Sequence, residues 1–284
     1  MKISKNLFML FISFSIFLIP LTLSNAEDKN IFSVRDKKTI SYWQMFDDIK
    51  KANIVFIGEY HNNELHHALQ LDIIKSLHGF DIPVAVGLEM FRAEDQKDLD
   101  MWVGGKLSEE DFIKVYYKNW NAPWPLYKNI FFYLRENKIP AVGLNIPLEI
   151  SRKVAASGFS SLTQEELEKL PTGISCTVDK KYMEFIKRAY SVHGDISKEF
   201  AHFCEAQLVW DHAMAWYLNE YARNNSGRIV IVLAGTGHSW KKGIPGQVKA
   251  LSEKISYRVI LPEIKNHIDS DKITIEDADY IMLN

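Results

Sequence analysis

Four segments of the chain are unbroken runs of apolar residues rather than alternations of apolar and polar ones. They are IVFI (54–57), IPVAVGLEMF (82–91), KIPAVGLNIP (138–147) and RIVIVLAG (228–235). Such runs are typical of strands that are buried on both faces, as in a parallel sheet covered by helices. The stretch YRVILPE (257–263) predicts a fifth strand.

The stretches between these runs have the periodicity of helices. Four aliphatic side chains share one stripe of residues 62–79: Leu65, Leu69, Ile73 and Leu77. A second long helical pattern covers residues 198–223. Because helices alternate with strands, we expect an α/β fold with a mainly parallel sheet covered by helices on both faces. His66 and His67 are expected to be solvated residues of the first helix.

The remaining segments are expected to fit around this sheet. Residues 27–45 predict an N-terminal hairpin with a polar turn at Asp36, Lys37 and Lys38. Residues 93–137 predict a helical insertion between the second and third strands. We expect residues 46–284 to form a single domain with this insertion, since a chain of this length suits one large α/β unit.

The first 26 residues have the pattern of a secretory signal peptide. Lys2 and Lys5 precede the apolar run LFMLFISFSIFLIPLTL, and Ser24 and Ala26 provide small side chains at the −3 and −1 positions of a cleavage site. The run is shorter than the ~20 mostly apolar residues of a spanning helix. We therefore expect cleavage and export to the periplasm, with an uncleaved membrane anchor as the alternative. No cysteine near the cleavage point offers a lipid attachment site.

Charge and cysteine content exclude several classes of protein. The chain has 34 Lys and Arg against 36 Asp and Glu, a formal net charge of −2, so it lacks the basic footprint of a nucleic-acid-binding protein. Cys176 and Cys204 could pair in an oxidising compartment, or both could remain buried free thiols. Neither lies in a CxxC or CxxCH motif, which argues against a thioredoxin-type site and against covalently attached haem.

The side chains that could bind a ligand or take part in catalysis lie at the ends of the predicted strands. The first run is followed by Glu59 and His61, Glu89 and Asn145 lie near the ends of the next two, and His238 follows the fourth. In an open parallel sheet the carboxyl ends of the strands share one edge, and ligands bind along it. We therefore expect one functional pocket to collect these side chains from four separate segments.

The helix predicted at residues 198–223 adds a second layer to this pocket. Gln207 and Asp211 interrupt its otherwise apolar face. A buried carboxylate is costly unless it is paired or hydrogen-bonded. Asp211 is therefore expected either to hold His238 or His61 in one tautomer, or to bind a backbone partner elsewhere.

The predicted insertion is rich in aromatic residues. They include Tyr116, Tyr117, Trp120, Trp124 and Tyr127. Packing in the core is the ordinary role of such residues. A flat apolar ligand also needs aromatic walls, and a tyrosine phenolate can be an axial ligand of ferric haem iron. The composition of the segment alone leaves both roles open.

Five stretches of the chain have a characteristic order and spacing: IVFIGEYHNNELHHALQLDII, VGLEMF, GLNIP, EAQLVWDHAMA and VLAGTGHSWKKGIPGQV. Together they resemble the ChaN family, haem-binding uptake proteins of the Tiki superfamily, from about Tyr42 to Pro262. The resemblance implies an α/β fold with a helical insertion. It also implies an exported accessory of haem and iron uptake, working with an outer-membrane haem receptor system and holding haem between two protomers of a homodimer.

The resemblance further implies that a tyrosine helps to hold the haem. Tyr127 lies where the family pattern has a tyrosine, and Tyr116 and Tyr117 are the alternatives.

The wider superfamily includes the erythromycin esterases and proteins classed as metal-dependent peptidases. Their motif positions match Glu59, His61, Glu89 and His238. Two imidazoles and two carboxylates suit a divalent metal ion that activates water. A metal-dependent hydrolase of peptides or esters is therefore the alternative function. In it Asn145, Gln207 and Asp211 would support the residues that touch the metal.

Overall fold

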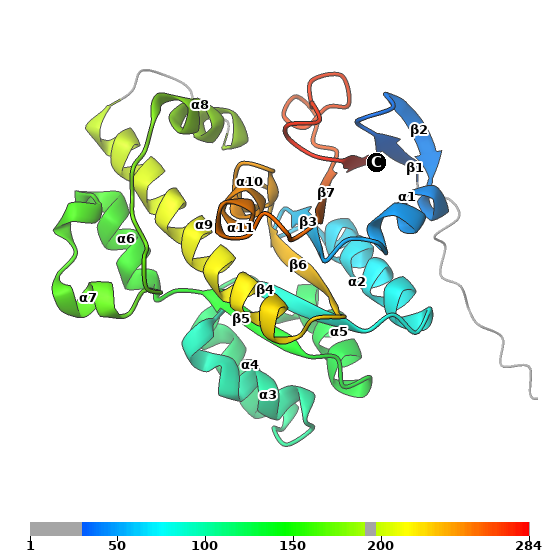
Figure 1. Ribbon diagram of the computed structural model, residues 1–284. Helices are drawn as coiled ribbons and strands as arrows, with labels where there is room; N and C mark the ends of the chain where they lie inside the picture. The colour runs from blue at the N-terminus through cyan, green and yellow to red at the C-terminus, as the bar shows by residue number, and fades with distance from the viewer. Residues whose placement is uncertain (1–29, 191–196, 284) are drawn as a thin grey trace, which may run out of the picture.

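The computed structural model describes residues 30–190 and 197–283, so the predicted signal peptide at residues 1–26 lies outside the described residues. An eight-stranded sheet in the order β2-β1-β8-β7-β3-β6-β4-β5 forms its centre (Figure 1). The strands are β1 (Asn30–Ser33), β2 (Lys38–Ser41), β3 (Ile54–Glu59), β4 (Val84–Arg92), β5 (Ala141–Asn145), β6 (Ile229–Gly235), β7 (Tyr257–Pro262) and β8 (Tyr280–Met282). All neighbours from β8 to β5 are parallel, which confirms the predicted mainly parallel sheet.

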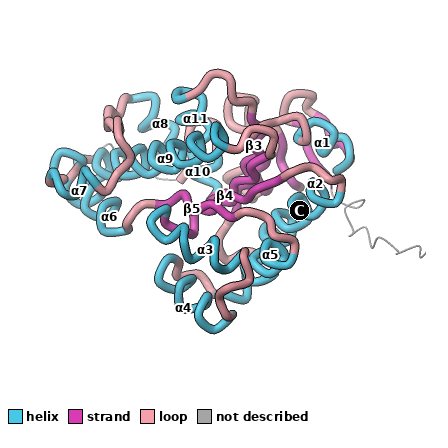
Figure 2. Tube along the Cα trace, turned by 60° about the horizontal axis from the view of Figure 1, so that its bottom comes forward, coloured by secondary structure: helices cyan, strands magenta, loops and turns pink. Residues whose placement is uncertain are grey.

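Helices cover both faces of the sheet, as predicted (Figure 2). One face packs against α1 (Tyr42–Ile49), α2 (Glu64–Gly79), α3 (Gln96–Val103), α4 (Glu109–Asn119) and α5 (Trp124–Glu136). The other packs against α8 (Lys180–Ala189), α9 (Lys198–Asn224) and α11 (Ile244–Leu251).

Strand β3 is an unbroken apolar run because both of its faces are buried. Neighbouring side chains of a strand point to opposite faces. Val55 and Ile57 therefore enter the core beneath α1 to α5, while Ile54 and Phe56 enter the core beneath α8, α9 and α11. All four are fully buried. Burying one such side chain contributes roughly 1.5–3 kcal/mol.

The edges of the sheet carry the connections. β1 and β2 form an antiparallel hairpin that joins the sheet through β8. The hairpin ends at Ser41, before the predicted boundary at residue 45, because Ser41 and Gln44 form the capping box that begins α1. Between β4 and β5 the chain forms a short 3-10 turn, η2 (Ala93–Asp95), and then α3, α4 and α5.

The segment after β5 builds a third cluster against α9. It contains α6 (Leu148–Ser157), η3 (Phe159–Ser161) and α7 (Gln164–Glu168). Cys176 and Cys204 are both free thiols, the second of the two predicted states. Within residues 30–190 and 197–283, no helix combines the length and the apolar character needed to cross a bilayer.

Candidate functional site

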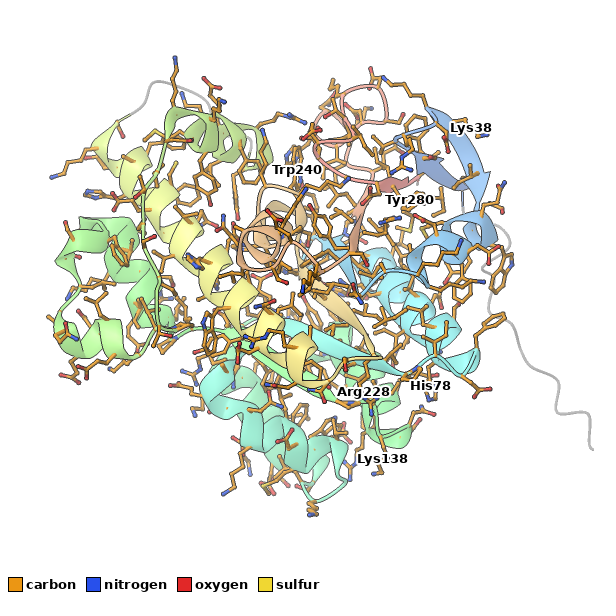
Figure 3. All side chains as sticks on the ribbon, viewed as in Figure 1. Lys38, His78, Lys138, Arg228, Trp240 and Tyr280 are labelled. Carbon is orange, nitrogen blue, oxygen red and sulfur yellow. The ribbon has the colours of Figure 1, made fainter. Side chains whose placement is uncertain are left out.

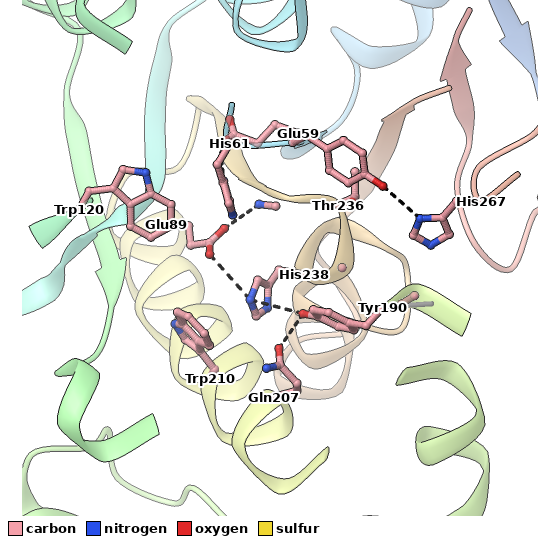
Figure 4. Close-up of a pocket in the computed structure, with 14 residues that line it drawn as sticks. Glu59, His61, Glu89, Trp120, Tyr190, Gln207, Trp210, Thr236, His238 and His267 are labelled. Carbon is pink, nitrogen blue, oxygen red and sulfur yellow. Dashed lines mark hydrogen bonds and ion pairs between the residues drawn. The ribbon is translucent and has the colours of Figure 1, made fainter. Parts of the chain in front are cut away.

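A cavity of about 390 Å³ opens at the carboxyl ends of β3, β4 and β6 (Figure 4). We call it the carboxyl-edge cavity. Glu59, His61, Glu89 and His238 all line it. The structure thus brings together four side chains that lie up to 179 positions apart, the separation of residues 59 and 238 in the chain. They meet because the parallel strands all end at this edge.

Glu59 is the most enclosed of the four carboxylate and imidazole groups. It accepts hydrogen bonds from Nδ1 of His61 at 2.8 Å and from the Gln70 amide at 2.6 Å. The Tyr127 hydroxyl also donates to it, and Nε2 of His67 lies 3.5 Å away. Burial favours the neutral acid, but His61 and His67 outweigh burial and hold the pKa of Glu59 well below its usual range. Glu59 is therefore an anion whose oxygen atoms are already engaged.

His61 extends from Glu59 toward the cavity. Its ring packs edge-on against Trp120, with 4.9 Å between ring centroids. Its Nε2 lies beside Gly235, where a Cβ atom would be only 3.1 Å away, so a side chain at this position would crowd the imidazole. Burial opposes a positive charge, but Glu59 and Glu89 raise the pKa of His61 to about 9. The wall of the cavity is therefore cationic at this point at neutral pH.

Glu89 lies between the two imidazoles (Figure 4). Its Oε2 accepts a 2.6 Å hydrogen bond from the Gly235 amide, and its Oε1 is 3.7 Å from Nε2 of His238. Asn145 donates a 2.6 Å hydrogen bond to the backbone carbonyl of Glu89 and accepts one of 2.5 Å from the Trp210 indole. Asn145 thus ties β4, β5 and α9 together behind the cavity.

His238 lies on the opposite wall of the cavity from His61, in the single helical turn α10 (Thr236–Ser239). Asp211 of α9 accepts a 2.6 Å hydrogen bond from its Nδ1, which is the first of the two expectations for Asp211. Gln207 lines the cavity and accepts a 2.6 Å hydrogen bond from the Tyr190 hydroxyl. That hydroxyl also lies 3.5 Å from Nε2 of His238. The helix α9 therefore orients the imidazole directly through the Asp211 carboxylate, while Gln207 holds the Tyr190 hydroxyl beside it.

The four predicted metal ligands line one cavity, and their role as metal ligands stays a prediction. Among the residues that the structure describes, no three His, Cys, Asp or Glu side chains are grouped so that they could hold one ion. Hydrogen bonds explain this in part: Glu59 is enclosed by four donors or imidazoles, and Oε2 of Glu89 is bound to a backbone amide. The donor set fits an acid–base network better than a metal centre.

The three tyrosines proposed as haem ligands do not line the cavity. Tyr127 is buried beneath Glu59, and Tyr116 is buried with its hydroxyl donated to the Ala122 carbonyl at 2.9 Å. Tyr117 is exposed, but its hydroxyl accepts a hydrogen bond from the Trp124 amide. The hydroxyls of Tyr127 and Tyr116 therefore lie in the core of the helical insertion and away from the cavity, and the role of these tyrosines as haem ligands stays a prediction.

Two expectations about this region are corrected. His66 and His67 are buried rather than solvated. His66 accepts a 2.8 Å hydrogen bond from the Tyr60 amide, and His67 packs on the ring of Tyr127 at 4.2 Å between centroids. Both histidines therefore belong to the layer that supports the cavity.

Several lining residues escaped the sequence analysis. Tyr60 lies between Glu59 and His61 at the end of the same strand, so it could have been predicted as a lining residue from its position in the motif. Tyr190 follows α8, and His267 lies in the loop after β7. Neither position follows a strand end or belongs to a motif, so no local pattern pointed to them.

A second cavity, of about 250 Å³, lies at the opposite edge of the sheet. It is lined by residues at the amino ends of β4, β5 and β6, including His78, Lys138 and Arg228 (Figure 3). Its lining includes the cationic side chains of Lys138 and Arg228, and each of them donates a hydrogen bond to a backbone carbonyl. Because this cavity is remote from the carboxyl-edge cavity, a substitution in it is a suitable control for that site.

Comparison with known proteins gives one family match. A family model described as haem-binding uptake, Tiki superfamily, ChaN matches residues 45–248. Among curated proteins, RETICULATA-RELATED 5, chloroplastic, of Arabidopsis thaliana is 22% identical over 246 residues, 80% of this chain. The aligned part is 32% of that protein, so the chain spans about a third of the length of this relative.

Solved structures share the fold. The ChaN protein of Campylobacter jejuni, whose structure describes cofacial haem binding, superimposes with a TM-score of 0.68 at 20% identity, covering 89% of this chain and 96% of that one. The type III effector HopBA1 gives a TM-score of 0.50 at 12% identity, covering 84% and 91%. At these identities the likeness shows the fold alone.

Proposed function

Because this chain belongs to the ChaN family of haem-binding uptake proteins in the Tiki superfamily, we propose that it binds haem in the carboxyl-edge cavity and assists haem uptake. The observation that carries the proposal is the composition of that cavity. Aromatic rings of Trp120, Tyr190 and Trp210 line it beside the cationic His61 and the half-exposed Tyr60. Its volume of about 390 Å³ is in the range of small-molecule and cofactor sites.

Each feature suits one part of haem. The porphyrin is flat and apolar, and aromatic walls suit such a ring. Its two propionates are anions, which the imidazolium of His61 would attract. Ferric iron takes phenolate or imidazole as an axial ligand, and when bound it would supply the redox and Lewis-acid chemistry of the complex. The protein's part is to orient these groups and to exclude water from one side of the ring.

A hemin titration followed by the Soret band tests the proposal. We expect a saturable red-shifted band with the mature chain. His61→Gln keeps a donor for Glu59 but removes the positive charge, so the affinity should fall by up to about fivefold, as for a partly exposed ion pair. His78→Gln, at the opposite edge of the sheet, is the matched control and should bind like the wild type. Absence of saturable binding by the wild type would overturn the proposal.

Export and assembly are part of the same proposal. We propose that residues 1–26 are a signal peptide that directs export to the periplasm, and that the protein works there as a homodimer with an outer-membrane haem receptor system; the basic start and apolar run of residues 1–26 support the export. Cell fractionation with N-terminal sequencing of the mature protein tests export. Sedimentation with and without hemin tests whether two protomers share the ligand. Retention in the cytoplasm with an intact N-terminus would contradict this part.

The cavity also supports a second candidate, hydrolysis by acid–base chemistry. Two imidazoles, each bound through Nδ1 to a buried carboxylate, face one cavity with Glu89 between them. In such a site the imidazolium of His61 can give a proton to a leaving group, while His238 in its neutral form can take one from water. In this version of the hydrolase the side chains themselves carry the proton.

A panel of peptides and esters assayed with and without EDTA separates the two candidates. The hydrolase predicts turnover that resists EDTA and is lost in His238→Gln. No turnover of any substrate, together with tight hemin binding, would leave haem uptake as the function.

A further inference from the structure

A third cavity, of about 230 Å³, lies where α8 meets the loop between α10 and α11 and the turn before β8. All but one of its lining residues are ionisable: Lys181, Glu184, Arg188, Lys242 and Asp277, with Phe185 as the exception. The four lining residues of α8 have the spacing i, i+3, i+4 and i+7, so they form one stripe of that helix. An apolar ligand could contact only the Phe185 ring, so the lining favours a charged ligand.

The floor of this cavity is held in place by hydrogen bonds. Asp277 is 2% exposed, and its Oδ2 accepts hydrogen bonds from the amide and the hydroxyl of Thr274 at 2.9 and 2.7 Å. The Arg188 guanidinium donates to the same oxygen atom and stacks over Trp240 at 4.9 Å. Asp277 and Arg188 therefore offset each other's charge in one fixed geometry. Because a guanidinium has five N–H donors, Arg188 can also donate to a second anion.

Two neighbouring lysines at this cavity differ in their surroundings. Lys241 donates hydrogen bonds to the Asp279 carboxylate at 2.7 Å and to the Ile275 carbonyl at 2.9 Å. Lys242 and Lys181 are exposed and line the cavity. Among the residues that the structure describes, the side chains of these two lysines form neither an ion pair nor a hydrogen bond. Two ammonium groups with no bound carboxylate therefore border the cavity.

The lining has a net positive charge. Lys181, Arg188 and Lys242 contribute three positive charges, and Glu184 and Asp277 contribute two negative ones, which leaves one positive charge in excess. Since Asp277 is bound to Arg188, the exposed Glu184 is the carboxylate of this lining that opposes the two lysines. The volume of about 230 Å³ is below the ~300–1,000 Å³ of typical small-molecule pockets. These features together fit a small anion.

We propose that this cavity binds a small phosphate, either free or as a monoester. The ammonium groups of Lys181 and Lys242 and the guanidinium of Arg188 donate to its oxygen atoms, and charge-assisted hydrogen bonds of this kind are the strong ones. A phosphomonoester presents three acceptor oxygen atoms, one for each cationic group, whereas a carboxylate presents only two. This inference does not depend on haem binding.

Titration of the wild type with inorganic phosphate and with glycerol phosphate, followed by NMR at low ionic strength, tests the site. We expect saturable binding. Lys242→Gln and Lys181→Gln should each weaken it by up to about fivefold, as for a partly exposed ion pair. Glu184→Gln removes the opposing charge and should strengthen binding by a similar factor, which loss of structure could not do. Lys249→Gln, an exposed lysine of α11 outside the lining, is the matched control and should bind like the wild type.

Vesicles that contain phosphatidic acid separate a soluble phosphate from a lipid headgroup as the source of the ligand. We expect the wild type to bind the soluble phosphates without vesicles. No saturable binding by the wild type, or equal affinity of the wild type and the three cavity variants, would overturn the site. Binding to the vesicles alone would also overturn it, because the lysines would then belong to a surface that contacts lipid and not to the cavity.

Discussion

Asp211 accepts a 2.6 Å hydrogen bond from Nδ1 of His238, and both side chains are almost completely buried. The pair joins the longest helix, α9, to the turn that follows β6. Burial opposes a charged imidazole, but the carboxylates of Glu89 and Asp211 outweigh it and raise the pKa of His238. A buried ion pair of this kind holds one geometry, because loss of either partner leaves an uncompensated charge.

Replacing Asp211 by Asn tests this pairing. The amide keeps a hydrogen-bond acceptor but removes the negative charge, so the free energy of unfolding at pH 7 should fall by about 1–3 kcal/mol, the range for a hydrogen bond to a charged group. The pKa of His238 measured by NMR should also fall. Asp271→Asn, on the exposed loop after β7, is the control and should change neither quantity. Equal stability of both variants would show that the pair contributes nothing.

The raised pKa of His61 predicts a dependence of stability on pH. The pKa is about 9 in the folded protein, against 6.5 for an unperturbed imidazole. The stabilisation is therefore complete below about pH 6.5 and is lost as the pH rises toward 9. Because the side chain is 41% exposed, solvent screening limits it to about 1 kcal/mol. Urea unfolding at pH 6 and pH 9.5 should show this loss in the wild type and a smaller one in His61→Gln. Parallel curves for both proteins would refute it.

The buried hydroxyl of Tyr127 predicts a structural role. In Tyr127→Phe the Glu59 carboxylate loses a donor in a dry environment, which should cost about 1–3 kcal/mol of stability. Hemin affinity should be unchanged once the fold is intact. Tyr117→Phe, with an exposed ring, should alter stability by less than about 1 kcal/mol. Loss of the Soret shift in Tyr127→Phe without loss of stability would restore Tyr127 as the ligand.

Two glycines predict opposite responses to alanine. A Cβ on Gly143 in β5 would lie 2.6 Å from the backbone oxygen of Arg92, so Gly143→Ala must push β5 away from β4 and should cost about 1–3 kcal/mol. A Cβ on Gly79, at the end of α2, meets nothing within 4 Å. Gly79→Ala should therefore leave stability equal or raise it by up to about 1 kcal/mol. Thermal unfolding of the pair measures both, and a neutral Gly143→Ala would contradict the packing of β5.

Features that depend on runs of residues could be predicted from the sequence. Unbroken apolar stretches marked β3 to β7, and their parallel direction followed from the helices between them. The same reasoning placed Glu59, Glu89 and His238 at one edge, where the structure also has them. β8 was missed because Tyr280–Met282 is too short to show a period, and it is a strand only through its pairing with β1 and β7.

Features that depend on tertiary contacts could not be predicted. His66 and His67 are polar by type, but α2 is buried on more than one side because it packs against the sheet and against α5. The resemblance made Tyr127 a candidate haem ligand, and only the fold shows that its hydroxyl points inward to Glu59. The contact between Tyr60 and His267 joins segments with no pattern in common.

The location of bound haem is the central claim. Crystals grown with hemin and measured at the iron absorption edge give an anomalous difference peak at the metal itself. We predict that peak in the carboxyl-edge cavity. A peak beside Tyr117 or in the cavity at His78, Lys138 and Arg228, or no peak despite bound hemin in the dissolved crystals, would contradict it.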